Sequence, residues 1–175
     1  MNRNTYKRKE LVLWQHTFVY IKRKEILMIS DKNIIHNEIN IDKVFVYGTL
    51  MKDFWNYKRY LEGRINRITL GRTYGLLYHL PEGYPALLKG NEIIEGEIME
   101  PVDEKLLKSL DRLEGYSKWR NDNLYVRELR KISTEDGNET ACWIYIYVNE
   151  GYAREKGILV PNGNWRKFIE NRRKL

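Results

Sequence analysis

The chain has little of what metal and thiol chemistry requires: one cysteine and three histidines among 175 residues. A single cysteine excludes an internal disulfide and any zinc site built from cysteines. None of His16, His36 and His79 lies at metal-ligand spacing from another, so no metal site is predicted. Cys142 falls within a predicted strand and is interpreted as a small core residue rather than a nucleophile. A lone thiol also fits a reducing compartment.

A long apolar run is also missing. The most apolar early stretch, 11–21, contains Gln15, His16 and Thr17 and is too short to cross a bilayer. Basic residues flank this stretch on both sides, and no small-residue cleavage site follows it, which argues against a signal peptide. The sequence therefore predicts a soluble, cytoplasmic protein with no membrane partner.

The net charge of +7 is concentrated at the two ends of the chain. Residues 1–40 carry eight Lys and Arg against four Asp and Glu, and residues 152–175 carry seven against two. Residues 41–151 carry sixteen against eighteen and are slightly acidic. Because a nucleic-acid-binding domain carries its basic patch on the folded surface, no nucleic-acid partner is expected. Binding of nucleic acid through the basic ends stays open as a minor hypothesis.

Signals of regular structure begin at Lys43. Strands are predicted over 44–47, 64–71, 73–80, 93–99, 124–132 and 141–148, with a turn at 136–138 and a short helix over 57–61. Residues 1–40 show no clear period and are predicted to be an N-terminal extension. Residues 1–27 stay open to a second interpretation, in which translation truly starts at Met28. Residues 41–175 are predicted to form one domain that ends in a basic tail.

One helix is predicted in more detail, over 104–114. Asp103 suits the N-cap because its carboxylate can accept from free N–H groups of the first turn. Four leucines repeat on one face at helical spacing, and Gly115 stands where a left-handed residue ends a helix. Several strands with few helices predict a closed or half-closed sheet in an α+β domain.

Two local features could carry chemistry. The first is the run Tyr47, Gly48, Thr49 and Leu50, directly after an apolar strand. Gly48 permits a sharp turn and close approach of a ligand, and successive backbone N–H groups after such a turn can hold an anion. An ordinary turn at the end of a strand accounts for the same residues.

The second feature is Glu114, in the last turn of the predicted helix. A carboxylate at the negative end of the helix dipole has a modestly raised pKa, and burial raises that pKa further, so Glu114 suits proton transfer. A solvated glutamate that happens to end the helix is the alternative. The sequence contains no phosphate-binding loop, dinucleotide fingerprint or nucleophile elbow, so hydrolysis through a triad is not expected.

Taken together and in order, these motifs resemble the γ-glutamylcyclotransferase-like proteins, which include the AIG2-like proteins. The resemblance rests on Tyr-Gly-Thr-Leu at 47–50, Leu-Asp-Arg-Leu-Glu-Gly-Tyr at 110–116, Gly-Tyr-Pro-Ala at 83–86, Gly-Glu at 96–97, Tyr-x-Arg at 125–127 and the segment 161–166. It covers about 120 residues of the chain and leaves the first 40 without a counterpart.

The resemblance implies a small mixed β-barrel with flanking helices, in which the 47–50 loop and Glu114 face one cavity. It implies conversion of a γ-glutamyl amine or peptide, a small-molecule substrate, to 5-oxoproline with release of the amine and without metal or cofactor. Glu114 would be the general acid/base, and Tyr47 to Leu50 would bind the substrate. Tyr125 is a candidate hydroxyl donor to the substrate, with core packing equally open. Arg127 is interpreted as a solvated strand residue in preference to a carboxylate ligand.

The alternative function is a non-catalytic member of the same fold that binds a small metabolite or a protein. The sequence specifies neither the leaving amine nor an oligomeric state.

Overall fold

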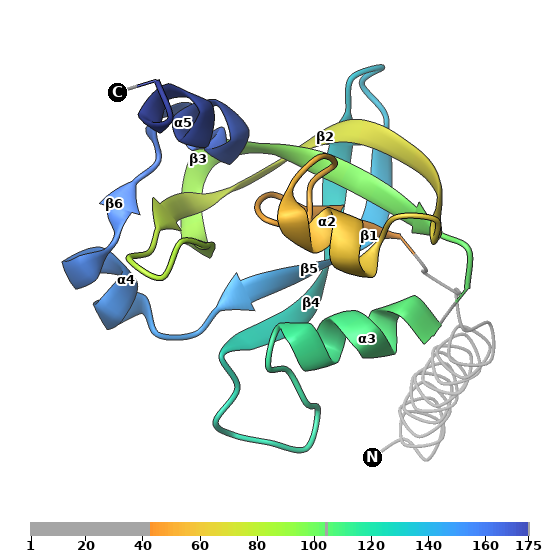
Figure 1. Ribbon diagram of the computed structural model, residues 1–175, viewed down its shortest axis with the longest axis horizontal. Helices are drawn as coiled ribbons and strands as arrows, with labels where there is room; N and C mark the ends of the chain where they lie inside the picture. Colours follow the sequence, from red (N-terminus) through yellow and green to blue (C-terminus); the bar gives the residue numbers. More distant parts are fainter. Residues whose placement is uncertain (1–42, 104, 175) are drawn as a thin grey trace, which may run out of the picture. The chain divides into compact units, whose positions relative to one another are not determined.

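The computed structural model describes residues 43–103 and 105–174, and the predicted N-terminal extension lies outside them. Figure 1 shows the elements along the chain. The strands are β1 (Val44–Val46), β2 (Ile65–His79), β3 (Pro85–Pro101), β4 (Tyr125–Thr134), β5 (Glu139–Tyr147) and β6 (Ile158–Leu159). The helices are α2 (Trp55–Tyr60), α3 (Lys105–Leu113), α4 (Glu150–Lys156) and α5 (Trp165–Arg172), with a 3-10 turn at Pro161–Gly163.

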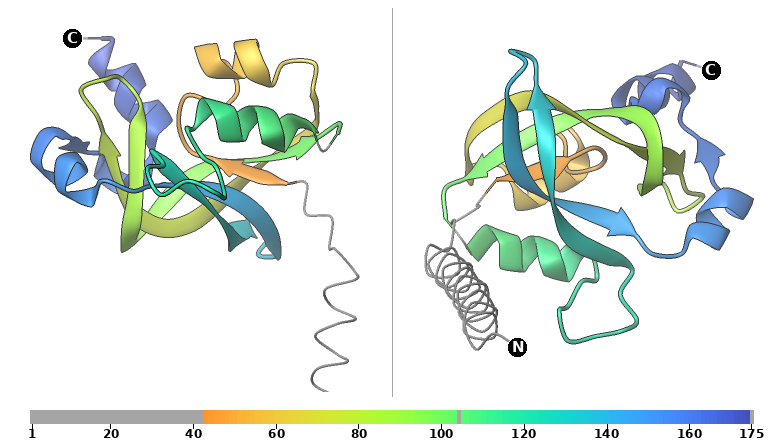
Figure 2. Two further views of the ribbon diagram at one scale, coloured as in Figure 1. Left: turned by 90° about the horizontal axis from the view of Figure 1, so that it is seen from below. Right: turned by 180° about the vertical axis from the view of Figure 1, so that it is seen from behind.

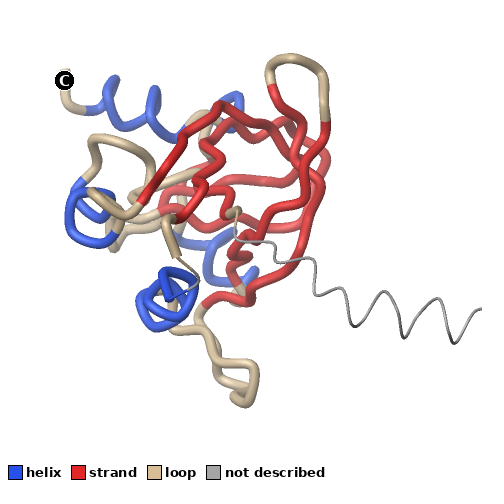
Figure 3. Tube along the Cα trace, turned by 90° about the vertical axis from the view of Figure 1, so that its right-hand side faces the viewer, coloured by secondary structure: helices blue, strands red, loops and turns tan. Residues whose placement is uncertain are grey.

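Five of the described strands close into a barrel. Their order is β3-β1-β5-β4-β2, and β2 pairs again with β3 to complete the ring. The sheet is mixed because β1 runs parallel to β5, at Val44 opposite Trp143, whereas the other pairings are antiparallel. The strands gather in one body with helices around it (Figures 2 and 3). The predicted small mixed barrel with flanking helices is confirmed.

The barrel interior is filled by large apolar side chains. Phe45, Ile98 and Ile132 are each at most 2% exposed. The three residues of β1 are all buried, and this strand has a hydrogen-bonded neighbour on each side. A short apolar strand is therefore enough to place the loop that follows it, since a close-packed core resists displacement.

Two predicted strands, 64–71 and 73–80, are wrong as separate elements, because β2 runs through both. Gly71 and Gly75 lie inside this strand rather than at breaks in it. A Cβ atom at Gly75 would lie 2.5 Å from the side chain of Leu87, and the register with β3 shifts between Gly75 and Leu76. These glycines mark close approach and a bulge, two ordinary reasons for glycine inside a strand.

The detailed helix prediction is confirmed with small changes at its ends. Helix α3 covers Lys105–Leu113, and the Asp103 carboxylate accepts from the N–H groups of Lys105 at 2.8 Å and Leu106 at 3.2 Å. Gly115 has a φ of +62°, the left-handed conformation expected after the helix. The side chains that α3 buries are leucines of the predicted apolar face.

The C-terminal segment, which was predicted only as a basic tail, folds into α4, β6 and α5. Trp165 is 2% exposed, and its indole N–H donates to Nδ1 of His79 at 3.3 Å. Strand β6 pairs with β2. Helices of seven and eight residues give a weak periodic signal, which explains why sequence periodicity missed them.

Cys142 is fully buried, as predicted, and burial raises the pKa of its thiol to about 12. Among residues 43–103 and 105–174, no helix has the length and apolar character needed to cross a membrane. Within the same ranges, no group of three or more His, Cys, Asp or Glu side chains is arranged to hold a metal ion.

The first prediction concerns Gly96, which faces β1. A Cβ atom there would lie 2.4 Å from the carbonyl oxygen of Val46 and 2.6 Å from the Phe45 ring. We expect Gly96→Ala to lower the free energy of unfolding by about 1–3 kcal/mol, as overpacking does. Denaturant unfolding measures the change. Gly151→Ala, which meets only one atom at 3.8 Å, is the control and should not lower stability. Equal stability of the two variants would contradict this account of the core.

Candidate active site

The loop after β1 presents free backbone donors. The chain turns after Val46, and the turn is closed by a hydrogen bond of 2.9 Å from Met51 N–H to the Gly48 carbonyl. The N–H groups of Gly48, Thr49 and Leu50 donate to no acceptor within the described residues. Buried N–H groups are normally paired with protein, water or a ligand. Three consecutive free donors are therefore suited to bind an anion.

The loop is held by Asn56, near the start of α2. The Asn56 side-chain amide donates to the hydroxyl of Thr49 at 2.8 Å, and the N–H of Tyr57 donates to the Thr49 carbonyl at 3.3 Å. The Thr49 N–H is not used by either contact. The sequence analysis did not single out Asn56, because a short helix with no apolar stripe gives no signal for such a role.

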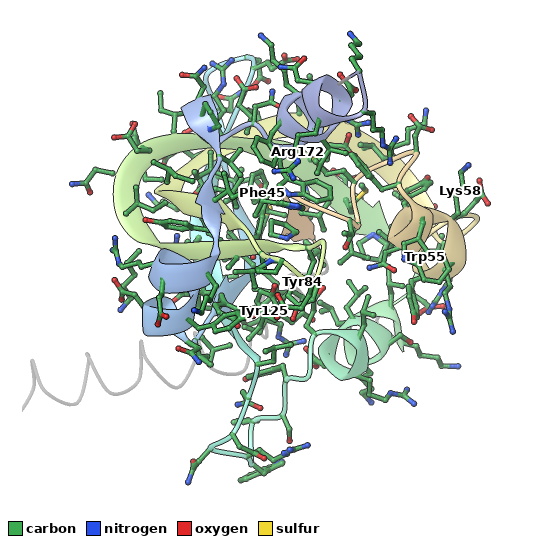
Figure 4. The ribbon with its side chains drawn as sticks, turned by 60° about the vertical axis from the view of Figure 1, so that its left-hand side comes forward. Phe45, Trp55, Lys58, Tyr84, Tyr125 and Arg172 are labelled. Atoms are coloured by element: carbon green, nitrogen blue, oxygen red, sulfur yellow. The ribbon has the colours of Figure 1, made fainter. Side chains whose placement is uncertain are left out.

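The facing wall is formed by the start of β3. A Cβ atom at Gly48 would lie 2.2 Å from the Pro85 ring, so the loop and Pro85 are in direct contact. The Tyr125 hydroxyl donates to the Pro85 carbonyl at 2.7 Å. Tyr84 and Tyr125 lie next to each other, with ring centroids 6.5 Å apart (Figure 4). Gly48 thus serves close approach, and its φ is not in the left-handed region.

Glu114 enters the site from the end of α3. Its N–H donates to the Leu110 carbonyl at 2.9 Å, which continues the helical pattern to this residue. The left-handed Gly115 then turns the chain away, and the N–H of Tyr116 donates to the Asp111 carbonyl at 2.8 Å. This helix ending fixes the backbone of Glu114 and leaves its side chain directed into the cavity described below.

The Glu114 carboxyl group is withdrawn from water, although the residue as a whole is only half-buried. Burial raises the pKa of Glu114 from 4.5 to about 7. Across the part of the chain that the structure describes, no group donates a hydrogen bond to this carboxyl to counter the effect. Burial is also the main cause that raises the pKa values of Tyr47 and Tyr125, and the nearby Glu114 charge adds to both. These tyrosines therefore remain protonated.

Tyr145 of β5 ties the two walls of the site together. The Tyr47 hydroxyl donates to the Tyr145 carbonyl, and the Tyr145 hydroxyl donates to the Asp111 carboxylate at 2.8 Å. Arg127 pairs with Asp111 at 3.0 Å, and its side chain is only 20% exposed. Arg127 is therefore not the solvated strand residue that the sequence analysis favoured. It is a partner of helix α3, one turn before Glu114.

The loop, Glu114 and Tyr125 all line one cavity of about 230 Å³. Every site residue predicted from the sequence is among its lining: Tyr47, Gly48, Thr49, Leu50, Glu114 and Tyr125. Tyr145, Asn56 and Leu124 also line it and were not predicted as site residues. Within the lining, Glu114 is the one side chain that is charged near neutral pH. The cavity combines a buried acid with backbone N–H donors, and their catalytic and binding roles remain predictions.

The fold and site are those of a small closed α+β barrel whose cavity holds a buried glutamate beside loop amides that have no acceptor within the described residues. Residues 44–167 match the family described as gamma-glutamyl cyclotransferase, AIG2-like. The chain belongs to this family, which confirms the resemblance.

Curated relatives agree with that family. A protein from Methanocaldococcus jannaschii, named among the gamma-glutamylcyclotransferases, is 34% identical over 73% of this chain and 98% of its own length. The gamma-L-glutamyl-butirosin B gamma-glutamyl cyclotransferase of Niallia circulans is 32% identical over 67% of this chain and 74% of its own.

Solved structures share the fold. The mouse AIG2-like protein has a TM-score of 0.54 and 26% identity, covering 71% of this chain and 88% of its own. YkqA from Bacillus subtilis has a TM-score of 0.57 at 20% identity, covering 77% of this chain and 43% of its own.

The second prediction concerns the ionisation of Glu114. We expect its carboxyl to titrate with a midpoint near 7, because burial raises its pKa. NMR titration of the chain labelled at the glutamate carboxyl carbons measures the midpoint, and Glu114→Gln assigns the resonance. Since folding raises this pKa, stability should fall as pH rises between about 4.5 and 7. Glu114→Gln should therefore gain melting temperature relative to the parent chain over that window. A midpoint near 4.5 would contradict the burial of this group.

Proposed function

We propose that this enzyme of the γ-glutamylcyclotransferase type converts a γ-glutamyl amine or peptide to 5-oxoproline and releases the amine, with Glu114 as general acid/base. The observation that carries the proposal is the shared cavity: Glu114 and the loop residues whose N–H groups have no acceptor within the described residues line the same space. The names of the relatives support a γ-glutamyl substrate, and that of the Niallia circulans protein specifies γ-glutamyl-butirosin B.

The reaction needs few groups because the nucleophile is part of the substrate. The α-amine attacks the γ-carbonyl carbon, a C–N bond forms to close a five-membered ring, and the C–N bond to the leaving amine breaks. Starting from the α-ammonium group, the attacking nitrogen loses two protons in becoming the ring N–H, and the departing nitrogen gains two in leaving as an ammonium ion. Well-oriented intramolecular reactions reach effective molarities on the order of 10⁵–10⁸ M, so the enzyme mainly has to fold and hold the substrate.

The loop amides are suited to hold the anionic part of the substrate. The cavity lining contains no Lys, Arg or His within the described residues, so a substrate carboxylate would be met by backbone N–H groups. The N–H groups of Gly48, Thr49 and Leu50 would bind the α-carboxylate and stabilise the oxyanion that forms at the γ-carbonyl. Removal of one such donor typically costs about 10²–10³ in rate.

Glu114 is suited to transfer both protons. A general base works best with a pKa near the working pH, and burial brings the pKa of Glu114 to about 7. In its charged form it would accept a proton from the α-ammonium group, and in its neutral form it would give that proton to the leaving nitrogen. The second proton, lost from the attacking nitrogen as the ring closes, would pass by the same route to the released amine. General acid/base catalysis of this kind contributes about 10²–10⁴ in rate.

Tyr125 would contribute through its oxygen. Its hydroxyl proton is engaged by the Pro85 carbonyl at 2.7 Å, so the oxygen keeps free lone pairs on the cavity side. We infer that Tyr125 accepts a hydrogen bond from the substrate ammonium group rather than donating one. In this arrangement Tyr125 also keeps Pro85 against Gly48.

A panel of γ-glutamyl compounds, assayed for 5-oxoproline by mass spectrometry, tests the reaction itself. The panel should include γ-glutamyl amino acids, γ-glutamyl-lysine isopeptides, glutathione and γ-glutamylated aminoglycosides. Formation of 5-oxoproline and free amine in equal amounts supports the proposal. A folded protein that binds members of the panel and turns over none would identify the non-catalytic alternative.

The third prediction concerns Glu114 in turnover. Glu114→Gln keeps the shape of the side chain but cannot accept the α-ammonium proton, so kcat should fall at least about 10²-fold while substrate binding persists. The parent enzyme should lose activity as pH falls below about 7, where Glu114 becomes protonated, and the variant should lack this limb. Steady-state kinetics across pH measure both effects. The same change at the exposed Glu170 is the control. An unchanged kcat in Glu114→Gln would exclude the general-base role.

The fourth prediction concerns Gly48 and substrate binding. Gly48→Val places a branched side chain against the Pro85 ring and pushes the loop and β3 apart. We expect affinity for the best substrate of the panel to fall at least about tenfold, since backbone donors act only when they converge on one point. Calorimetry in the Glu114→Gln background measures binding without turnover, and thermal melting verifies folding. Normal affinity in a folded Gly48→Val variant would mean that the loop is only a turn.

A further inference from the structure

An ion pair between a buried glutamate and a partly exposed arginine lies outside the lining of the cavity. Glu97 of β3 is 6% exposed, and it and Thr73 are the buried polar side chains of the described residues. Its partner is Arg166 of α5, with 2.8 Å between Nη2 of the arginine and Oε1 of the glutamate. Burying a charge such as that of Glu97 is unfavourable unless it is paired and hydrogen-bonded, so the contacts of this pair indicate what it does.

Both partners hold the peptide groups of Lys52. Oε2 of Glu97 accepts from the Lys52 N–H at 2.7 Å. The same Nη2 atom of Arg166 that contacts Glu97 also donates to the Lys52 carbonyl at 2.8 Å. The backbone of Lys52 is therefore fixed on its donor and its acceptor side. Lys52 lies two residues after Leu50, at the far end of the loop.

Glu97 also controls the near end of the loop. It stands opposite Val46 in the pairing of β3 with β1, and Val46 is the last residue of β1. The loop 47–51 is thus held at entry by backbone pairing at Glu97 and at exit by the Glu97 carboxylate. With both ends fixed to one residue, the free N–H groups between them have little freedom to diverge.

Arg166 connects this arrangement to the C-terminal helix. Its guanidinium lies 5.0 Å from the centroid of the Phe54 ring, which in turn packs against Trp165 at 5.0 Å. Phe54 follows Lys52 by two residues, so α5 contacts the loop exit through an aromatic ring and an ion pair together. The C-terminal segment, far away in sequence, thereby reaches the substrate-binding loop.

We propose that Glu97 and Arg166 are positioning residues that hold the 47–51 loop so that its N–H groups converge on the substrate carboxylate. The inference rests on the proposed function for its kinetic consequences but not for its structural ones. If the pair positions the loop, its loss should weaken substrate binding and leave proton transfer by Glu114 intact. If the pair only stabilises the fold, the folded fraction should behave normally.

The test compares Arg166→Met and Glu97→Gln with Arg166→Lys. We expect KM to rise at least tenfold in the first two variants. The pH below which activity falls, which is assigned to Glu114, should not change. Arg166→Lys should recover much of the loss, because an ammonium group can donate to both Glu97 and Lys52. The double variant should be little worse than either single one, as expected for groups that act as a unit.

The matched control is Ile169→Ala, which removes a half-buried apolar side chain of α5 that packs on the core and cannot take part in the ion pair or its hydrogen bonds to Lys52. It should lower the melting temperature without changing KM. A control that raises KM as much as Arg166→Met does, at equal loss of melting temperature, would overturn the proposal.

A second measurement does not depend on activity. Amide hydrogen exchange at Met51, whose N–H closes the loop on the Gly48 carbonyl at 2.9 Å, should be at least tenfold faster in Arg166→Met than in the parent chain, with exchange at Ile144 of β5 unchanged. If the parent chain forms no 5-oxoproline, the proposed function fails and this exchange result alone decides the positioning role. Unchanged exchange at Met51 in folded Arg166→Met and Glu97→Gln would overturn it.

Discussion

The double attachment of Tyr145 is the interaction on which the geometry of the site depends. Its carbonyl accepts a hydrogen bond from the hydroxyl of Tyr47 at the start of the loop, and its hydroxyl donates to the Asp111 carboxylate on α3. The loop follows β1 and the helix that leads to Glu114 follows β3, and β5 joins them. Strand β1 runs parallel to β5 at Val44, and the loop follows β1 directly. The distance between donor amides and the acid is thus set by one strand.

The buried position of Glu114 shows a conflict between stability and chemistry. A carboxylate in a cavity is unfavourable in its charged form, which is why its pKa rises to about 7. The helix dipole acts in the same direction, since α3 presents its negative end to this residue. The surrounding core offsets the cost, with Leu106 and Leu110 fully buried beneath the helix. The charged Glu114 carboxylate therefore lowers the stability of the fold at neutral pH, and the same raised pKa suits it to proton transfer.

Local signals predicted much of the fold. The helix at 105–113 was predictable because its N-cap, apolar face and left-handed glycine all depend on neighbours within a few residues. The same holds for the turn at Gly137, with its φ of +80°. Strand β2 was divided wrongly because glycine in a sequence indicates an interruption, whereas Gly71 and Gly75 give way to side chains from other strands. That contact is invisible in the sequence, since Leu87 and Ile132 come from distant elements.

The sequence by itself determined the candidate groups: an apolar strand followed by Tyr-Gly-Thr-Leu, and a helix that ends at Glu114. Backbone conformation and helix termini follow from nearby residues, so these assignments needed no tertiary information. Only the tertiary structure decided that the two features share a cavity, that Arg127 pairs with Asp111, and that Glu97 and Arg166 reach the loop from β3 and α5. Burial and long-range pairing arise from barrel closure, and they set both the pKa of Glu114 and the direction of the loop amides.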